Sequence, residues 1–278
     1  MRRAEAALFT LFHALLVFQL LPLCAPFSSP SPSFCNLSDL PPLEDPDLSW
    51  EIVGGDGRLS VKSARTRQSF HVTYENGGRA GGGDGPLQSV VKACRHRKNS
   101  TNFIVDTTLG LGGDSYVLAS SSLKPVVLGF ERDARVFHLS LDGLRRARSS
   151  EIVDSLAFKN EDSRDALIKC IRQGGLIDGR EVDVVYIDVM FEKLKKNRSK
   201  AKKGMEFLRN LLSSSDQTPE SIDLRNSEAR DLLSLSLRVI SLTKGRVVVK
   251  RERGAPDLGV TPSFVVAENK NVRFDVYV

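Results

Sequence analysis

The sequence predicts an α/β protein in which a mostly parallel, doubly wound sheet follows a small antiparallel β appendage. Apolar strands alternate with amphipathic helices from residue 94 to residue 278, which is typical of parallel strands joined by helical crossovers. A glycine-rich turn follows the first of these strands, and acidic residues end several of them, at Asp106, Glu131 and Asp188. Because open α/β sheets bind ligands at the carboxyl ends of their strands, these features also predict where a site lies.

Size and composition allow one sizeable core and favour an anionic partner. The chain has 278 residues, of which 41% are hydrophobic, and a formal net charge of +6. Nucleic acid is therefore the leading candidate partner. The histidines and cysteines lack the spacing of a zinc site, so we expect no metal. We expect reduced thiols, two of them buried, among Cys24, Cys35, Cys94 and Cys170.

The N-terminus has the layout of a secretory signal or a membrane anchor. Arg2 and Arg3 precede the apolar run Ala6–Leu23, and a Ser/Pro-rich linker follows at Phe27–Pro46. A large residue and a proline flank the candidate cleavage position Ala25, which disfavours cleavage. A wrongly chosen start codon ranks first, an organelle-targeting leader second and a true anchor third. We therefore predict a cytoplasmic enzyme, with an organelle as the alternative and membrane contact only if the segment is retained.

The pattern divides the chain into three parts: residues 1–47 are leader and linker, 48–93 are the appendage with a glycine-rich loop, and 94–278 are the α/β domain. In the appendage we expect strands at Ser49–Val53, Arg58–Ala64 and Ser69–Tyr74 and a helix at Pro86–Ala93. In the α/β domain we expect strands at Phe103–Val105, Pro125–Phe130, Leu156–Phe158, Val182–Ile187 and Arg246–Lys250. Helices are expected at Asp114–Ser120, Arg132–Arg148, Ser163–Gln173 and Leu232–Leu242, and a terminal hairpin at Ser263–Ala267 and Asn271–Val278.

The first candidate site is the turn between the first strand of the domain and its helix. Glycines let the backbone approach a ligand, and the helix start offers unpaired N–H groups. Glu131 lies about 20 residues beyond the turn, where nucleotide-binding folds place an acid on ribose hydroxyls. The candidate cofactor residues are Asp106, Gly110, Gly112, Gly113, Asp114 and Glu131. A plain β–α turn is the structural alternative, and nicotinamide binding is weaker because Ser115 or Tyr116 stands where a third glycine is needed.

The second candidate site is the segment Val185–Phe191, at the end of the most apolar strand. The carboxylate of Asp188 can accept a hydrogen bond from an amine, and Phe191 can stack on a base. The alternative is that Phe191 belongs to the core, as most aromatic residues after a strand do.

A dense basic run comes directly after this segment. It comprises Lys193, Lys195, Lys196, Arg198, Lys200, Lys202 and Lys203, and we expect Lys250, Arg251 and Arg253 to add to the same edge of the sheet. Such a cluster lies on a solvated surface and suits phosphate contacts. The alternative is a solvated loop with no partner.

Together these segments resemble the bacterial family of small-subunit (16S) ribosomal RNA guanine-N2 methyltransferases known as RsmJ. The resemblance runs from Leu48 to Val278, and its most specific segments are Val105–Asp114, Val117–Ala119, Val184–Phe191, Lys202–Met205, Arg246–Arg251 and Arg273–Tyr277. It implies a Rossmann-like class I methyltransferase fold over residues 94–278. It also implies that S-adenosylmethionine (SAM) is bound through the residues matching Gly113, Asp114, Glu131, Arg132, Asp162, Ser163 and Asp188.

Two departures from the family pattern leave alternatives open. Val189 stands where the family has proline, and Gly113 stands where it has arginine. Val189 keeps a backbone carbonyl that can accept from the guanine amine together with Asp188, while Phe191 stacks on the base. A catalytically silent RNA-binding or ribosome-assembly protein is the rival hypothesis, and a methyltransferase for small molecules or proteins is also open. Every version of the catalytic hypothesis requires the glycine turn and the Asp188 loop to meet at one rim of the sheet.

Overall fold

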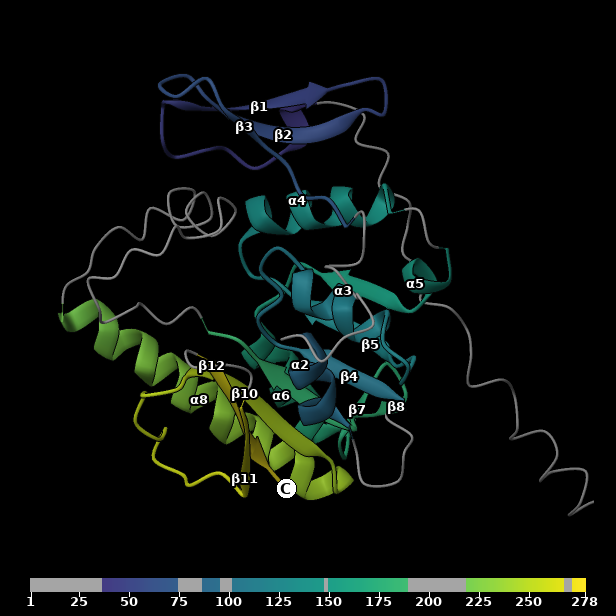
Figure 1. The fold of residues 1–278 in the computed structure, drawn as a ribbon, viewed down its shortest axis with the longest axis vertical. Helices are drawn as coiled ribbons and strands as arrows, with labels where there is room; N and C mark the ends of the chain where they lie inside the picture. Colours follow the sequence, from purple (N-terminus) through teal and green to yellow (C-terminus); the bar gives the residue numbers. More distant parts are fainter. Residues whose placement is uncertain (1–36, 75–86, 96–101, 148–149, 190–218, 268–271) are drawn as a thin grey trace, which may run out of the picture. The chain divides into compact units, whose positions relative to one another are not determined.

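A seven-stranded sheet forms the centre of the protein (Figure 1). The computed structural model describes residues 37–74, 87–95, 102–147, 150–189, 219–267 and 272–278. The order of the strands across the sheet is β11-β12-β10-β9-β4-β5-β6. Their bounds are β4 Phe103–Asp106, β5 Val126–Phe130, β6 Leu156–Lys159, β9 Val184–Ile187, β10 Arg246–Glu252, β11 Phe264–Ala267 and β12 Val272–Tyr277.

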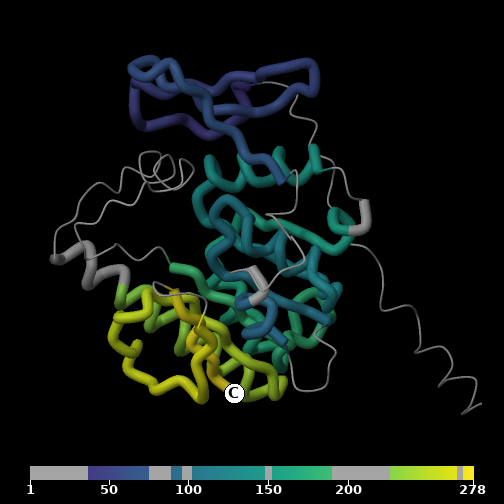
Figure 2. The backbone as a smooth tube through the Cα atoms, viewed as in Figure 1, coloured from purple at the N-terminus to yellow at the C-terminus, as the bar shows by residue number. Residues whose placement is uncertain are grey.

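The sheet is parallel except for the last two strands of the chain, β11 and β12, which lie along one side of it. Strands β6, β5, β4, β9 and β10 pair in parallel, whereas β12 runs antiparallel to both β10 and β11. Every residue of β4 and β9 is buried, as expected for strands that are covered on both faces. The predicted fold class and the predicted terminal hairpin are confirmed, and β10, β11 and β12 lie together at the yellow end of the chain in Figure 2.

Helices cover both faces of the sheet. They are α2 Leu87–Cys94, α3 Gly113–Ala119, α4 Ala134–Arg145, α5 Ser150–Asp154, α6 Ser163–Arg172 and α8 Pro219–Thr243. Helices α3 and α4 share one core cluster with Ile104 of β4 and Val127 of β5, whereas α6 and α8 pack on the other face. Helices α6 and α8 pack against each other, and α2 packs against α3. Asp133 and Asp162 cap α4 and α6, because each side chain accepts backbone N–H groups of the first turn.

The appendage is a three-stranded antiparallel sheet of β1 Leu48–Val53, β2 Arg58–Ser63 and β3 Ser69–Phe70, preceded by the 3-10 helix η1 Leu37–Asp39. The strand predicted at Ser69–Tyr74 ends early, at Phe70. Beyond it the chain packs against α4 and the glycine turn: Arg146, at the end of α4, donates to the Val72 carbonyl at 2.6 Å, and Tyr74 Oη donates to the Leu111 carbonyl of the turn at 2.9 Å. The alternation of apolar residues there reflects burial against a helix and not strand pairing.

Sequence reasoning missed a short hairpin between α6 and β9. Strands β7 Leu176–Ile177 and β8 Arg180–Glu181 pair across Asp178 and Gly179, both of which have positive φ. An Asp-Gly pair between two short runs is a strong hairpin signal, so the sequence held the information.

Cys94 and Cys170 are both buried, which agrees with the prediction for two of the four cysteines. The apolar run Ala6–Leu23 lies outside the described residues. Within the described ranges, no helix has both the length and the apolar character needed to cross a bilayer.

Asp142 on α4 joins the appendage to the rest of the protein. Its side chain is 1% exposed, and its carboxylate accepts from the Leu59 backbone N–H at 3.0 Å and from Arg146 Nε at 2.8 Å. Arg145 adds a second guanidinium contact at 3.1 Å. A buried carboxylate stabilises the fold only while its donors are present, because its charge would otherwise be buried without compensation.

Replacing this carboxylate should therefore be costly. Asp142→Ala is expected to lower the free energy of unfolding by about 3 kcal/mol, since it leaves the buried Leu59 N–H without its acceptor and removes the carboxylate that pairs with Arg145 and Arg146. Urea unfolding followed by circular dichroism measures the loss. Asp154→Ala, at an exposed position on α5, is the matched control and should change stability little. Equal stability of the two variants would contradict the anchoring role of Asp142.

Candidate active site

A cavity of about 560 Å³ lies at the carboxyl ends of four neighbouring parallel strands. Segments that follow β4, β5, β6 and β9 line it together with Leu232 and Glu228 of α8. The glycine turn and the Asp188 loop meet there, because the Asp188 N–H donates to Thr108 Oγ1 at 2.6 Å. The predicted convergence of the two loops is confirmed. The predicted site residues in the lining are Gly110, Glu131, Arg132, Asp162, Ser163, Asp188 and Val189.

The other cofactor residues predicted at the end of β4 and in the turn lie outside the lining; they are Asp106, Gly112, Gly113 and Asp114. Asp106 is 2% exposed, and its carboxylate accepts from the Thr108 N–H at 3.0 Å and from Ser115 Oγ at 2.7 Å. Burial raises the pKa of Asp106 to about 7, although these two bonds oppose the shift. Asp106 thus ties the glycine turn and α3 to the end of β4. The sequence predicts that Asp106 contacts a ligand, whereas in the structure its side chain bonds to Thr108 and Ser115 within the protein.

The three glycines of the turn have different surroundings. Gly110 has φ 52°, lines the cavity and donates its N–H to Glu131. Gly112 caps α3 with φ 71°, and a Cβ there would lie 2.3 Å from Tyr74 Oη. Gly113 has a negative φ and open space around it. The close approach at Gly112 is therefore to the segment that follows the appendage and not to the cavity.

Glu131 is held at the cavity wall by backbone donors. Its carboxylate accepts from the Gly110 N–H at 2.9 Å and from the Asp133 N–H at 2.8 Å, and burial raises its pKa. An ionised carboxylate has about four acceptor positions, so these two bonds leave capacity for hydroxyl donors of a ligand.

Acids outnumber cations in the lining. It contains three guanidiniums, of Arg132, Arg135 and Arg164, and six carboxylates, of Glu131, Asp133, Glu161, Asp162, Asp188 and Glu228. Five of the six carboxylates pair with cations nearby: Asp133 with Arg135, Asp162 with Arg164, Glu161 with Lys169, Glu228 with Arg132 and Asp188 with Lys250. Glu131 is held by backbone donors and is thus the acid most available to a ligand, while Asp188 keeps further acceptor positions beside its ammonium partner. The excess of acid in the lining favours a cationic ligand.

Asp188 belongs to a charge cluster at the ends of β9 and β10. Lys250 Nζ lies 2.8 Å from a carboxylate oxygen of Asp188 and 2.8 Å from one of Asp114, which also accepts from Tyr186 Oη at 2.7 Å. Burial raises the pKa of Asp188 to about 6, although Lys250 opposes this. At Asp114 burial acts upward as well, but Lys250 and Tyr186 outweigh it and lower the pKa. The sequence offered no signal for this pairing, because Lys250 and Asp114 are 136 residues apart.

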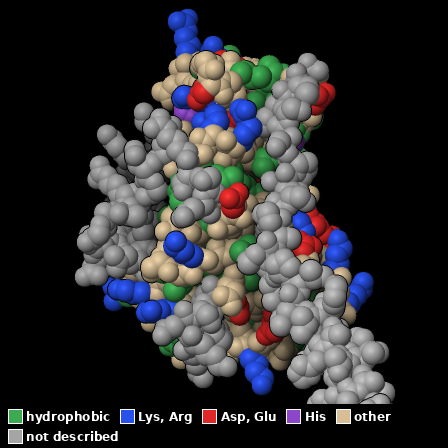
Figure 3. All heavy atoms as spheres, turned by 90° about the vertical axis from the view of Figure 1, so that its right-hand side faces the viewer, with side chains coloured by type: hydrophobic (Ala, Val, Ile, Leu, Met, Phe, Trp, Pro, Cys, Tyr) green, Lys and Arg blue, Asp and Glu red, His purple; other side chains and the backbone are tan. Residues whose placement is uncertain are grey.

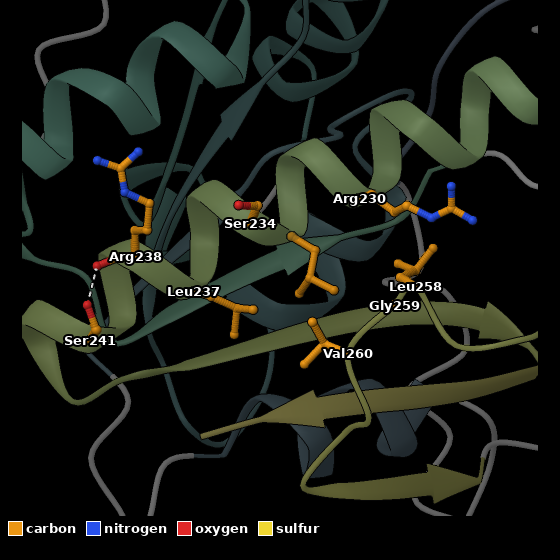
Figure 4. Close-up of a pocket in the computed structure, with 9 residues that line it drawn as sticks. Arg230, Ser234, Leu237, Arg238, Ser241, Leu258, Gly259 and Val260 are labelled. Atoms are coloured by element: carbon orange, nitrogen blue, oxygen red, sulfur yellow. Dashed lines mark hydrogen bonds between the residues drawn. The ribbon is translucent and has the colours of Figure 1, made fainter.

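A second cavity, of about 490 Å³, lies between α8 and the segment that precedes β11. Figure 4 shows Arg230, Ser234 and Arg238 along the helix opposite Leu258–Val260. At 100° per residue, these helix positions lie on the side of α8 away from Glu228 and Leu232. Its described lining contains no carboxylate, so it lacks the acceptor that an amine substrate needs. The first cavity is therefore the candidate active site.

The family model SAM_MT, which describes SAM-dependent methyltransferases, matches residues 45–278. The chain belongs to this family. This methyltransferase is 36% identical over 243 residues to ribosomal RNA small subunit methyltransferase J of Shewanella pealeana, an alignment that covers 84% of this chain and 88% of the relative. It is 31% identical over 241 residues to the protein of the same name from Coxiella burnetii, with 84% and 85% covered.

A solved structure shares the fold of this methyltransferase. The SAM-dependent methyltransferase from Neisseria gonorrhoeae is 24% identical, with a TM-score of 0.56 over 80% of this chain and 79% of that chain. The predicted family, the Rossmann-like fold and SAM as cofactor are thereby confirmed. The acid excess and the free acceptor capacity of Glu131 fit a cofactor with a sulfonium cation and ribose hydroxyls.

Two of the cations predicted to contact RNA are placed differently in the methyltransferase structure. Lys250 is engaged by two carboxylates, and Arg251 is 2% exposed and donates to the Pro256 carbonyl at 2.6 Å. Because successive residues of a strand point to opposite faces, the two side chains lie on different sides of β10, and acceptors within the protein hold each of them. On the face shown in Figure 3, the described Lys and Arg side chains are scattered among acidic ones. The basic run Lys193–Lys203 and Phe191 lie outside the described residues.

The contrast between Gly112 and Gly113 gives a test of the turn. Gly112→Ala should lower the free energy of unfolding by roughly 1–3 kcal/mol, because an L residue at positive φ is strained and the new Cβ meets Tyr74. It should weaken SAM binding too, since the turn positions Gly110. Gly113→Ala is the matched control and should leave both quantities near wild type. Denaturant unfolding and calorimetric titration with SAM provide the measurements, and the reverse order of the two variants would contradict this account.

Proposed function

We propose that this methyltransferase transfers the methyl group of SAM to the exocyclic N2 of a guanine in small-subunit ribosomal RNA. The observation that carries the proposal is the presence of Glu131 and Asp188, both with acceptor capacity, on the walls of one cavity at the carboxyl ends of β5 and β9. The relatives, which are ribosomal RNA small subunit methyltransferases by name, support ribosomal RNA as the substrate class. The resemblance to the RsmJ family supports the guanine amine.

Glu131 is proposed to accept hydrogen bonds from the ribose hydroxyls of the cofactor. Gly110 supplies backbone at the same wall, and Arg132, Asp162 and Ser163 form the neighbouring wall after β5 and β6. Gly113 and Asp114, which the resemblance implicates, lie outside the lining: Gly113 begins α3, and Asp114 pairs with Lys250. When bound, SAM supplies an electrophilic methyl group on a sulfonium.

Asp188 and the backbone carbonyl of Val189 are proposed to hold the target amine. The lone pair of guanine N2 is delocalised into the ring, so two acceptors that bind its N–H groups favour the pyramidal, nucleophilic form and orient it. Valine retains the carbonyl that proline would provide. Asp188 also stabilises the positive charge that develops on N2 and can accept its proton. A paired or stacked guanine cannot reach the cavity, so the base must be unstacked, and we propose that Phe191 then stacks on it.

We propose that the remaining parts serve RNA docking. The basic run from Lys193 to Lys203, directly after Asp188 and Val189, is positioned in sequence to contact phosphates near the flipped base. Residues 94–278 would form the catalytic domain and 48–93 its appendage, with 1–47 as leader and linker. The proposed location is the cytoplasm, with the ribosomal subunits.

Methyl transfer to RNA tests the proposal directly. The full chain is incubated with labelled SAM and small ribosomal subunits that lack their methyl groups, and the nucleosides are then analysed. Label in N2-methylguanosine is expected. Label in another nucleoside only would reject the guanine assignment. Calorimetric SAM binding with no transfer to any RNA would favour the catalytically silent alternative.

Asp188→Asn should lower the methyl-transfer rate by about 10²–10³-fold, because the isosteric amide loses the charge that stabilises the developing cation. In the wild type the rate should fall as the pH drops below about 6, where Asp188 takes up a proton and ceases to be an ionised acceptor. Single-turnover rates across pH 5–9 provide the measurement. Asp154→Asn on α5 is the control, and a wild-type rate in Asp188→Asn would remove this residue from the mechanism.

Glu131→Ala should weaken SAM binding roughly 10–100-fold, the loss expected for hydrogen bonds to a charged group of about 1.5–3 kcal/mol. The rate at saturating SAM should fall much less, since Glu131 lies away from the target amine. Calorimetric titration gives the affinity. Glu181→Ala, at an exposed position on β8, is the control. Unchanged affinity in Glu131→Ala would exclude the proposed ribose contact.

A further inference from the structure

Lys250 connects two carboxylates that come from different parts of the fold. Its ammonium lies 2.8 Å from Asp188, at the end of β9, and 2.8 Å from Asp114, in the first turn of α3. All three side chains are partly exposed, at 27% for Lys250, 28% for Asp114 and 33% for Asp188. The cluster is therefore open to a ligand although its members bind one another.

The backbone register places these groups side by side. Val249 of β10 pairs with Ile187 of β9, so Lys250 and Asp188 each stand one residue beyond the last pair of the ladder. The Asp188 N–H is held by Thr108 Oγ1 at 2.6 Å. Thr108, which follows β4, thus holds the backbone of Asp188, and Lys250 of β10 holds its carboxylate.

We propose that Lys250 is a positioning residue that keeps Asp188 an ionised hydrogen-bond acceptor, so that the site selects an amine of the substrate and rejects a carbonyl oxygen. This inference rests on the proposed function, in which Asp188 receives the N–H of the target base. It adds the group that determines whether Asp188 accepts or donates a hydrogen bond. That role in turn decides which edge of a base the cavity can bind.

The charge balance explains why a cation is required. Two adjacent carboxylates in a partly buried site cannot both stay ionised without a compensating charge. Asp106 at the end of β4 adds a third acid that interacts with both. Tyr186 on β9 and Cys94 on α2 face the same region, and burial raises the pKa of each, so they stay neutral. Lys250 is the cation whose ammonium contacts both Asp114 and Asp188.

Loss of that cation would reverse the hydrogen-bonding role of Asp188. An ionised carboxylate only accepts, whereas a protonated one also donates through its O–H. With Lys250 removed, Asp114 and Asp188 would share a proton, and a protonated Asp188 would suit a carbonyl oxygen better than an amine. The positive ammonium thus determines which functional group the cavity recognises, without touching the substrate itself.

The test follows the ionisation of Asp188 directly. Side-chain carboxyl carbons are observed by ¹³C NMR in the full chain, and Asp188 is assigned by comparison with Asp188→Asn. In the wild type Asp188 should titrate near pH 6. In Lys250→Met, loss of the nearby cation should raise this midpoint by roughly 1–3 pH units. The double variant Lys250→Met with Asp114→Asn should bring it down again, because the competing carboxylate is then neutral.

Matched variants separate this role from a merely structural one. Lys159→Met breaks a surface ion pair of 2.7 Å with Asp178 and should leave the titration of Asp188 unchanged. Asp114→Asn alone retains Lys250 and should lower the Asp188 midpoint, which keeps the inference testable if Lys250→Met fails to fold. Lys250→Arg keeps the charge and should retain a midpoint closer to the wild type than that of Lys250→Met.

The pH dependence of methyl transfer should move with the titration. At pH 7 the Lys250→Met rate should fall about tenfold or more and recover towards pH 9, where Asp188 ionises again. An unshifted Asp188 midpoint in Lys250→Met, or no effect of Asp114→Asn in either background, would overturn the inference. The titration needs no substrate, so an enzyme that methylates something other than guanine N2 would refute the proposed function and leave this result interpretable.

Discussion

The parallel pairing of β4 with β9 is the constraint on which the rest of the structure depends. Val105 lies opposite Val185, and both strands end at the same edge of the sheet. Parallel strands must be joined by crossovers, so helices cover both faces and the strand ends remain open to a ligand. The Thr107 N–H continues the ladder to the Tyr186 carbonyl at 3.0 Å. The glycine turn and Asp188 therefore meet as a consequence of backbone geometry.

Electrostatics then decides what the open edge can bind. Most acids of the cavity are neutralised by nearby cations or are helix caps, as Asp133 and Asp162 are. Those that retain acceptor capacity are Glu131 and Asp188, on the walls formed by different strands. A cationic methyl donor and an amine acceptor both match a site with surplus negative charge. Lys250 neutralises part of this negative charge beside Asp188, where the amine is proposed to bind.

The appendage is physically linked to this site. Tyr74 lies stacked on Tyr116 of α3 at 4.9 Å between ring centroids, and its hydroxyl lies so close to Gly112 that a Cβ there would collide with it. Asp142 holds β2 against α4, which itself begins at the cavity wall. A change in how the appendage packs would thus shift the glycine turn, because Tyr74 and Asp142 connect the two. The appendage and the turn form one packed unit with α3 and α4.

Sequence alone determined the strands and helices of the central sheet, the glycine turn, the acids at the strand ends and the family, because each of these is a local pattern or a linear motif. The short helix α5 and the hairpin of β7 and β8 were missed. Tertiary structure decided which of the matching residues face the cavity. Asp106 accepts from Ser115, Arg251 is buried and donates to the Pro256 carbonyl, and Lys250 pairs with acids 62 and 136 residues away. The sequence pattern of a charged residue near a strand end is the same whether its side chain contacts solvent, a ligand or another charge. Only the packing of distant segments against one another settles which partner it has.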